Sequence, residues 1–211
     1  MKKLLYINGN PQSEDLSFSK RVGNYYLKYL HENDDNLDVS IFNIYEEYVP
    51  LIDEDVLGAW RELGSGTNFN DLSKNQQNKV ARMNEILEMF KNTDEYVIVT
   101  PLWNFGIPPM LKAFIDNIVI AGKTFKYTET GPVGLIEGKK ALLIQASGGY
   151  YSSGPTASME HGSNYLKTIL GFVGIADVKT LLLEGVAVPG KSSEDKLKAF
   201  YKQVDGIFEA K

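Results

Sequence analysis

The segment that decides the fold is DEYVIVTPLWNFGIPPMLKAFIDNIVIAGKTFKY, residues 94–127. Its run from Tyr96 to Thr100 is rich in β-branched residues and uninterrupted by charge, which is typical of a strand buried on both faces of a parallel sheet. Pro101 is expected to end the hydrogen-bonded ladder, so that residues 102–106 form a turn. Pro108 and Pro109 favour the start of a helix, where a missing amide costs least. Because ligands of open α/β sheets bind beyond the carboxyl ends of the strands, this turn is the first place to expect a site.

Strands and helices alternate on either side of this segment. Further strands are predicted over residues 3–7, 37–44, 140–146 and 178–183. Helices are predicted from Ser17 or Ser19 to about residue 30, and over residues 55–63, 73–91, 108–121, 165–173 and 192–209. Residues 152–162 are expected to form a flexible loop, and residues 123–138 a β-arm over the site. The pattern predicts an α/β fold: a doubly wound five-stranded parallel sheet with helices on both faces, in a single domain over residues 1–211.

Composition excludes several classes of function. The chain has 211 residues with 22 basic and 27 acidic side chains and a net charge of −5, and no basic stripe, so nucleic acid is not an expected partner. It contains no cysteine, which removes disulfides, thiolate nucleophiles and iron–sulfur clusters. No histidine–carboxylate spacing indicates a metal site. No stretch is apolar for long enough to span a membrane, and the short N-terminal apolar run does not fit a signal peptide. We therefore expect a soluble, cytoplasmic protein.

The loop after the first strand has the composition of an anion site. Ser17, Phe18 and Ser19 stand where the first helix is predicted to begin. Free amides and the helix dipole bind phosphate at such a position, and hydroxyl groups add donors without adding charge. Serine is also an ordinary helix cap, so this motif alone leaves a phosphate site and a simple cap both open.

Two further turns follow buried strands. In the first, Trp103 and Phe105 flank Asn104, which suits a flat, partly polar heterocycle, although aromatic residues at turns are also common packing residues. In the second, Ser147 precedes the paired glycines Gly148 and Gly149, which allow a ligand to approach the backbone closely.

Two other motifs point to different chemistry. Residues 185–192, GVAVPGKS, match the phosphate-loop pattern G-x-x-x-x-G-K-S. Pro189 has no amide to offer a phosphate, and the run VAV is expected to continue the last strand, so a nucleotide hydrolase is a weak alternative. Ser147 and His161 do not form a serine hydrolase motif, because Gln145 stands where the first glycine of G-x-S-x-G is required.

With these motifs in place, the chain resembles the FMN-dependent NADH-azoreductases, also called NADH:quinone oxidoreductases. The resemblance covers almost the whole chain, including Ser17-x-Ser19 and Gly148-Gly149, and it is carried most specifically by PLWNFGIP at residues 101–108 and TFKYTETGPVGL at residues 124–135. It implies a flavodoxin-like fold, noncovalently bound FMN, and a homodimer with two active sites at the subunit interface.

The resemblance also implies a role for each group of site residues. The phosphate and ribityl chain of FMN would be held by Asn10, Ser17, Phe18 and Ser19. The isoalloxazine ring would be lined by Pro101, Leu102, Trp103, Asn104 and Phe105, and its pyrimidine edge contacted by Ala146, Ser147, Gly148 and Gly149. Family members often have Met-Tyr in place of Leu102-Trp103 and arginine in place of Ser147, which leaves the substrate range and the choice between NADH and NADPH undecided.

The implied reaction is a ping-pong hydride transfer. NADH or NADPH reduces FMN at N5 and leaves, after which a quinone or an aromatic azo compound accepts two electrons. The flavin carries the hydride, so no catalytic side chain and no metal are required. The alternative from another class is a flavodoxin-like electron carrier that holds FMN and does not react with nicotinamide. The arm at 123–138 and the aromatic residues of 45–70 favour the enclosed site of an enzyme.

Overall fold

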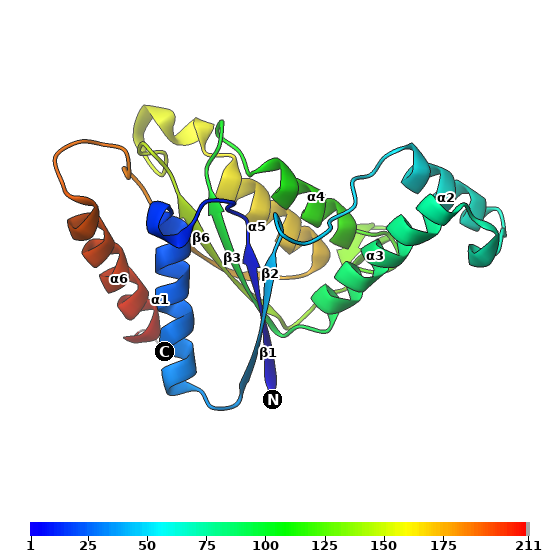
Figure 1. Cartoon of the computed structure of the whole chain (residues 1–211), viewed down its shortest axis with the longest axis horizontal. Coiled ribbons are helices and arrows are strands. Elements are labelled where there is room, and N and C mark those ends of the chain that lie inside the picture. The colour runs from blue at the N-terminus through cyan, green and yellow to red at the C-terminus, as the bar shows by residue number, and fades with distance from the viewer. Residues whose placement is uncertain (210–211) are drawn as a thin grey trace.

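The computed structural model describes residues 1–209 and has a parallel five-stranded sheet at its centre (Figure 1). The strands are β1 (Lys2–Asn8), β2 (Leu37–Asn43), β3 (Glu95–Pro101), β6 (Lys140–Ala146) and β7 (Asp177–Leu183). Their order is β2-β1-β3-β6-β7, the order of flavodoxin-like sheets, which confirms the predicted fold class. In register, Pro101 pairs with Ala146 and Ala146 with Leu183, so the carboxyl ends of β3, β6 and β7 are level.

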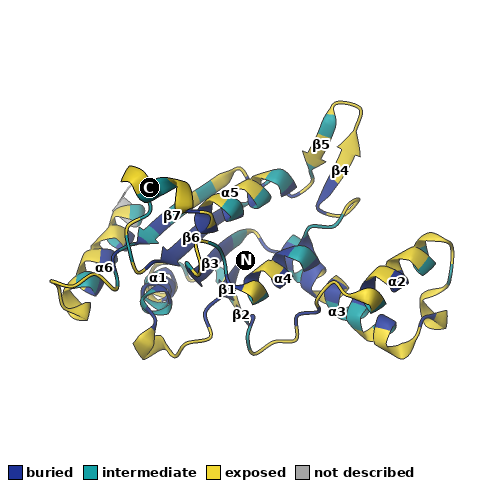
Figure 2. Ribbon diagram, turned by 90° about the horizontal axis from the view of Figure 1, so that it is seen from above, coloured by how far each residue is buried: buried dark blue, intermediate teal, exposed yellow. Residues whose placement is uncertain are grey.

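Helices cover both faces of the sheet (Figures 1 and 2). On one face lie α1 (Phe18–Asn33) and α6 (Ser193–Glu209), which pack on Leu4, Tyr6 and Val97. On the other lie α3 (Lys74–Lys91), α4 (Pro109–Ile118) and α5 (Gly162–Val173), which pack on Leu5 and Ile98. Both faces of β1 and β3 are therefore buried, as their uninterrupted apolar sequences predict.

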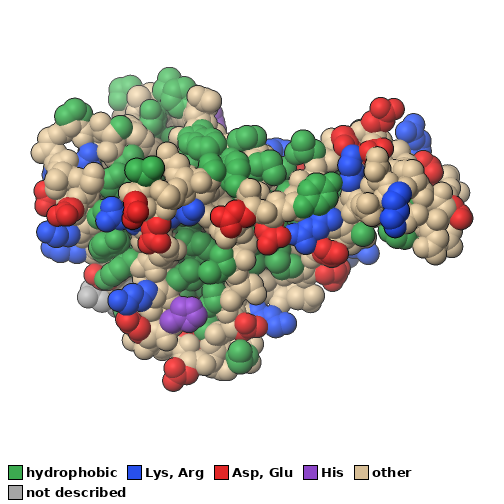
Figure 3. Space-filling view, viewed as in Figure 1, with side chains coloured by type: hydrophobic (Ala, Val, Ile, Leu, Met, Phe, Trp, Pro, Cys, Tyr) green, Lys and Arg blue, Asp and Glu red, His purple; other side chains and the backbone are tan. Residues whose placement is uncertain are grey.

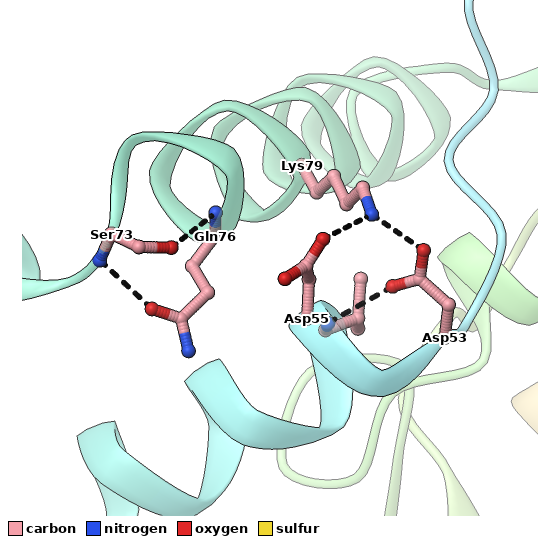
Figure 4. Close-up of polar contacts among 6 residues, drawn as sticks. Asp53, Asp55, Ser73, Gln76 and Lys79 are labelled. Carbon is pink, nitrogen blue, oxygen red and sulfur yellow. Dashed lines mark hydrogen bonds and ion pairs between the residues drawn. The ribbon is translucent and has the colours of Figure 1, made fainter.

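The amino-terminal half of α3 extends beyond the sheet together with α2 (Glu54–Gly64), as Figure 1 shows. Short 3-10 turns, η1 (Glu14–Leu16) and η2 (Phe69–Asp71), lie before α1 and α3. Figure 4 shows a capping box of Ser73 and Gln76 at the start of α3. It also shows the contact that joins the two helices: Lys79 Nζ of α3 lies 2.5 Å from Asp53 and 2.6 Å from Asp55, at the start of α2. The hydrogen bonds to these carboxylates raise the pKa of Lys79.

The structure corrects the prediction that Pro101 ends the ladder. The amide of Leu102 still donates to the carbonyl of Ala146, at 2.7 Å, so the pairing of β3 with β6 runs past the proline. The carbonyl of Val99 faces β1, where it accepts from Gly9. Backbone groups of residues two apart in a strand face the same side, so the nitrogen of Pro101 also faces β1. At the level of Pro101, β1 has already ended. The missing amide therefore costs no ladder hydrogen bond.

The segment after β3 also differs from its prediction. The helix ends at Ile118 rather than residue 121, because Thr124 Oγ1 donates to the carbonyl of Ile118 and accepts from the amide of Ile120. The arm is confirmed as a hairpin of β4 (Phe125–Thr128) and β5 (Gly131–Gly134). It lies against the carboxyl end of α5, where the amide of Ile136 donates to the carbonyl of Val173. That the arm lies over the site stays a prediction.

The predicted loop at residues 152–162 contains a 3-10 helix, η3 (Gly154–Met159), and α5 begins at Gly162, three residues before the predicted start at Tyr165. Among residues 1–209, no helix is both long enough and apolar enough to cross a lipid bilayer.

Candidate functional site

A pocket of about 220 Å³ lies at the carboxyl ends of β1, β3 and β6. It sits where the strand order reverses between β1 and β3, which is the usual ligand position in this topology. The lining residues are Asn10, Gln12, Leu16, Ser17, Phe18, Ser19, Pro101, Leu102, Trp103, Ala146, Gly148 and Val186. Another hollow, beside Leu4 and Lys140, is at the amino ends of the strands and contains none of the predicted residues.

One wall of the pocket is a buried polar network at the start of α1. Asn10 Nδ2 donates to Ser17 Oγ at 2.8 Å and lies 3.4 Å from Ser19 Oγ, and the two hydroxyl oxygens are 3.1 Å apart. Ser17 also caps the helix by accepting the amide of Lys20 at 3.2 Å. The amides of Phe18 and Ser19, in the first turn, have no intrahelical acceptor. The wall therefore offers hydrogen-bond donors to an anion at the amino end of α1, where the helix dipole is positive.

A tight turn over residues 103–106 adjoins the pocket, which Trp103 lines. Trp103 and Gly106 exchange backbone hydrogen bonds of 2.9 Å each. The two residues between them have left-handed backbones, with φ of 48° at Asn104 and 66° at Phe105. Asparagine tolerates this conformation, but a phenylalanine there is strained by about 1–2 kcal/mol. Strain of this kind concentrates at functional sites because the surroundings must impose it.

Aromatic side chains are exposed beside the pocket. Trp103 is 38% exposed and Phe105 is 41% exposed, and the Phe105 ring meets the edge of Tyr151. Figure 3 shows apolar side chains gathered along the upper edge of the molecule, where Figure 1 places the loops that follow the strands. The turn therefore presents ring surface to solvent next to the polar wall.

Another wall joins the loops after β6 and β7. The amides of Gly185, Val186 and Ala187 donate to the carbonyls of Gly149, Ser147 and Gly148, at 3.0 to 3.1 Å. The prediction that VAV continues the last strand is therefore wrong: β7 ends at Leu183, and these residues form a turn. Because their amides are already used, they cannot cradle a phosphate as a phosphate loop does.

Comparisons with known proteins agree with this geometry. A family model described as a flavodoxin-like fold matches residues 2–207. The chain is 50% identical over 200 residues to FMN-dependent NADH:quinone oxidoreductase 3 of Bacillus cereus, with 93% of each chain covered. It is 47% identical to FMN-dependent NADH:quinone oxidoreductase of Geobacillus kaustophilus, covering 97% of this chain and 98% of that one. The chain belongs to the family of FMN-dependent NADH:quinone oxidoreductases.

A solved structure supports the same membership. The crystal structure of an FMN-dependent NADH-azoreductase from Bacillus anthracis, in complex with FMN, superposes with a TM-score of 0.92 at 40% identity, covering 98% of this chain and 97% of that one. The resemblance to this family seen in the sequence is therefore confirmed.

The structure brings most of the residues implied by the family resemblance to one pocket. Those that line it are Asn10, Ser17, Phe18, Ser19, Pro101, Leu102, Trp103, Ala146 and Gly148. Asn104 and Phe105 form the adjoining turn, while Ser147 is buried and donates to the carbonyl of Gly149, so these four residues flank the pocket and do not line it.

Sequence reasoning missed three lining residues, Gln12, Leu16 and Val186. Gln12 and Leu16 belong to the same loop as Asn10 and Ser17, so a prediction for the whole loop would have included them. Val186 lies in the segment dismissed as an accidental phosphate-loop match. The neighbouring positions of β6 and β7 were the available signal, since carboxyl ends of parallel strands share one edge.

The lining residues that the structure describes include no acidic, basic or histidine side chain. Any charge on a ligand is therefore met by amides, hydroxyl groups and the dipole of α1, not by a counter-ion. The lining residues described here thus offer neutral donors and apolar surface, and no histidine or carboxylate that could act as a general base.

Proposed function

We propose that the chain is an FMN-dependent oxidoreductase that takes electrons from NADH or NADPH and passes them, two at a time, to quinones and aromatic azo compounds. The observation that carries the proposal is the pocket between β1 and β3, with a neutral anion-binding wall on one side and exposed rings on the other. The relatives named as FMN-dependent NADH:quinone oxidoreductases and NADH-azoreductase support it.

The polar wall fits the phosphate and ribityl chain of FMN. The free first-turn amides of Phe18 and Ser19 and the hydroxyl groups of Ser17 and Ser19 are donors that a phosphate requires. Asn10 is 4% exposed and holds both serine side chains, so these donors are positioned before any ligand arrives. The residues present therefore suit an anionic group without a lysine or arginine.

The remaining walls fit the isoalloxazine ring. Leu102 and Trp103 line the pocket, and the strained turn holds Asn104 and Phe105 beside it. Gly148 also lines the pocket and, without a side chain, lets a ring approach its backbone closely. FMN, when bound, accepts a hydride from the nicotinamide and returns two electrons to the acceptor. The protein's part is to orient the ring, offer backbone donors to its edge and exclude water.

We also propose that the enzyme is a homodimer. A hollow of about 460 Å³ is lined by Ile52, Trp60, Ile115, Asp116, Val119, Ile120, Ala121, Phe125, Tyr165 and Ile169. The β4–β5 hairpin beside it leaves Tyr127 75% exposed, and a two-stranded hairpin of this kind is marginal without a partner surface. A second copy of the chain would cover both. Light scattering after size-exclusion chromatography should give twice the mass of one chain, and a monomeric mass would contradict the proposal.

The two alternatives are less favoured. A phosphate-loop hydrolase has no free amides at residues 185–187, and the named relatives are enzymes that use NADH, not electron carriers. The single domain over residues 1–211, the cytoplasmic location and the absence of nucleic-acid partners stay predictions. Limited proteolysis, cell fractionation and a DNA-binding assay would test them.

The experiment that tests the function is an anaerobic visible absorption spectrum of the FMN-loaded protein. A flavin band that bleaches with NADH or NADPH, and recovers when a quinone or an azo dye is added, is the expected result. A band that persists with both nucleotides would favour the carrier. Failure to retain FMN after desalting would refute the proposed cofactor.

A further inference from the structure

A buried carboxylate lies behind the aromatic turn, outside the pocket. Glu160 is 5% exposed and follows η3, immediately before His161 and the start of α5. Glu160 is not part of the family motifs quoted above, and the proposed reaction does not require it. A buried carboxylate is costly unless its oxygens are hydrogen-bonded, so its retention needs an explanation.

Neutral donors satisfy both carboxylate oxygens of Glu160. Oε1 accepts from Gln145 Nε2 and from the amide of Ser163, each at 2.9 Å. Oε2 accepts from Ser163 Oγ at 2.8 Å and from the amide of Asn164 at 3.3 Å. The amides belong to the first turn of α5, whose dipole also favours a negative charge. Among residues 1–209, no lysine, arginine or histidine forms an ion pair with it.

These hydrogen bonds tie together two segments that meet at the pocket. Gln145 is the residue of β6 just before the lining residue Ala146. On the other side of Glu160, the amide of His161 donates to the carbonyl of Phe105 at 2.9 Å and also to that of Met159 at 3.1 Å. Phe105 is the residue with φ of 66°. Glu160 thus lies between the end of β6 and a hydrogen bond that reaches the strained turn from α5, in addition to the two that Trp103 and Gly106 exchange.

The packing around Gly162 leaves little freedom at this junction. A Cβ at Gly162 would lie 2.2 Å from Gln145 Oε1 and 2.8 Å from Leu102 Cδ1. The start of α5 therefore rests directly on the end of β6 and on a residue that lines the pocket. A shift of the first turn of α5 must move His161 and, with it, the acceptor carbonyl of Phe105.

We propose that Glu160 is a positioning residue: its carboxylate anchors the first turn of α5 to Gln145, so that the His161 amide helps to keep Asn104 and Phe105 in the left-handed conformation in which they flank the pocket. This inference rests on the proposed function for the identity of the ligand, FMN. The anchoring itself is a property of the ligand-free chain and is measured separately.

The test compares the apoproteins of Glu160→Gln and a matched control, Glu62→Gln. In the control, Glu62 Oε1 accepts from Gln76 Nε2 at 2.9 Å, the same kind of contact as that of Gln145 with Glu160, but on α2. In Glu160→Gln, an amide group replaces an oxygen and faces donors, so at least one hydrogen bond is lost. Hydrogen exchange of peptides containing residues 102–106 and 160–164 is measured first, followed by the FMN dissociation constant from flavin fluorescence.

We expect Glu160→Gln to speed exchange of both peptides and to raise the FMN dissociation constant about tenfold, with an altered circular dichroism spectrum of the bound flavin. Glu62→Gln should leave all three unchanged. Ser163→Ala, which keeps the charge and removes one donor to Oε2, should give a smaller effect in the same direction; it carries the test if Glu160→Gln does not fold.

Two results would overturn the proposal. Unchanged exchange at residues 102–106 would mean that Glu160 does not hold the turn. Faster exchange with an FMN dissociation constant within about twofold of wild type would mean that it only stabilises α5. If the wild-type protein fails to bind FMN, the proposed function falls, while the exchange of the apoproteins still decides whether Glu160 positions the turn.

Discussion

Replacing Ser17 by alanine tests the helix cap and the anion site together, because one hydroxyl group serves both. The two roles are distinguished by measuring stability and FMN binding separately. Ser17 Oγ caps α1 through the amide of Lys20 and accepts Asn10 Nδ2 at 2.8 Å. Loss of a serine cap costs about 1 kcal/mol of the free energy of unfolding. The buried Asn10 amide keeps only the longer contact to Ser19, at 3.4 Å, and its poorer satisfaction adds about 1 kcal/mol. We therefore expect the apoprotein of Ser17→Ala to lose about 2 kcal/mol.

Ser17→Ala should also weaken FMN binding, by more than the loss of the helix cap alone would cause. A hydrogen bond to a charged group contributes about 1.5–3 kcal/mol, so the FMN dissociation constant should rise at least about tenfold. Urea unfolding of the apoprotein gives the first quantity and flavin fluorescence titration gives the second.

Ser73→Ala is the matched control, since Ser73 Oγ caps α3 through the amide of Gln76 at 3.3 Å and lies outside the pocket. It should lose about 1 kcal/mol of stability and bind FMN normally. If Ser17→Ala is destabilised but binds FMN within about twofold of wild type, Ser17 is only a cap, and the phosphate has been placed at the wrong wall.

Three further substitutions test other parts of the structure. Phe105→Gly relieves a left-handed backbone at a residue already 41% exposed, so the apoprotein should be no less stable in urea, while FMN binding weakens; a loss of about 3 kcal/mol would show that the ring is a packing residue instead. Gly9→Ala should destabilise the apoprotein, because its Cβ would lie 2.9 Å from the carbonyl oxygen of Val99 in β3, and an unchanged urea midpoint would contradict that contact. For Glu160, burial raises the pKa, but the hydrogen bonds from Gln145 and Ser163 outweigh it and hold the pKa below its ordinary value. The unfolded chain therefore binds the proton more readily, so this stabilisation is present above about pH 4.3 and is lost as the pH falls towards the lower folded-state pKa. Unfolding of Glu160→Gln should show a shallower loss of stability over that acid range, and identical slopes would refute the assignment.

The fold was predictable because its signals are local. A strand buried on both faces requires an uninterrupted apolar run, and residues 96–100 are one. Ser17 and Ser73 stand at the helix starts that they cap, and Gly174, with φ of 108°, ends α5 where the sequence predicts. Strand order then followed from the family resemblance, and the pocket from the rule that ligands bind where that order reverses.

What the sequence did not predict depends on contacts between distant segments. The turn at residues 185–187 is fixed by carbonyls of residues 147–149, which no local pattern of VAV reveals. The arm was expected over the site because it is long and aromatic, and among residues 1–209 it packs on the end of α5, through Ile136 and Val173. A hairpin whose exposed face finds no cover in its own chain is instead evidence about a partner surface.

Contacts between distant segments also explain how a site without charged side chains could bind an anion selectively. An anion bound by lysine or arginine side chains needs few constraints, because a long flexible charge finds its own geometry. In the proposed FMN site the donors are backbone amides and short hydroxyl groups, which act only where the backbone places them. The polar wall is set by Asn10 and the start of α1, and the aromatic wall by a strained turn that the His161 amide holds. Positional accuracy therefore replaces charge, and residues outside the pocket, Glu160 among them, should govern cofactor binding as strongly as residues that line it.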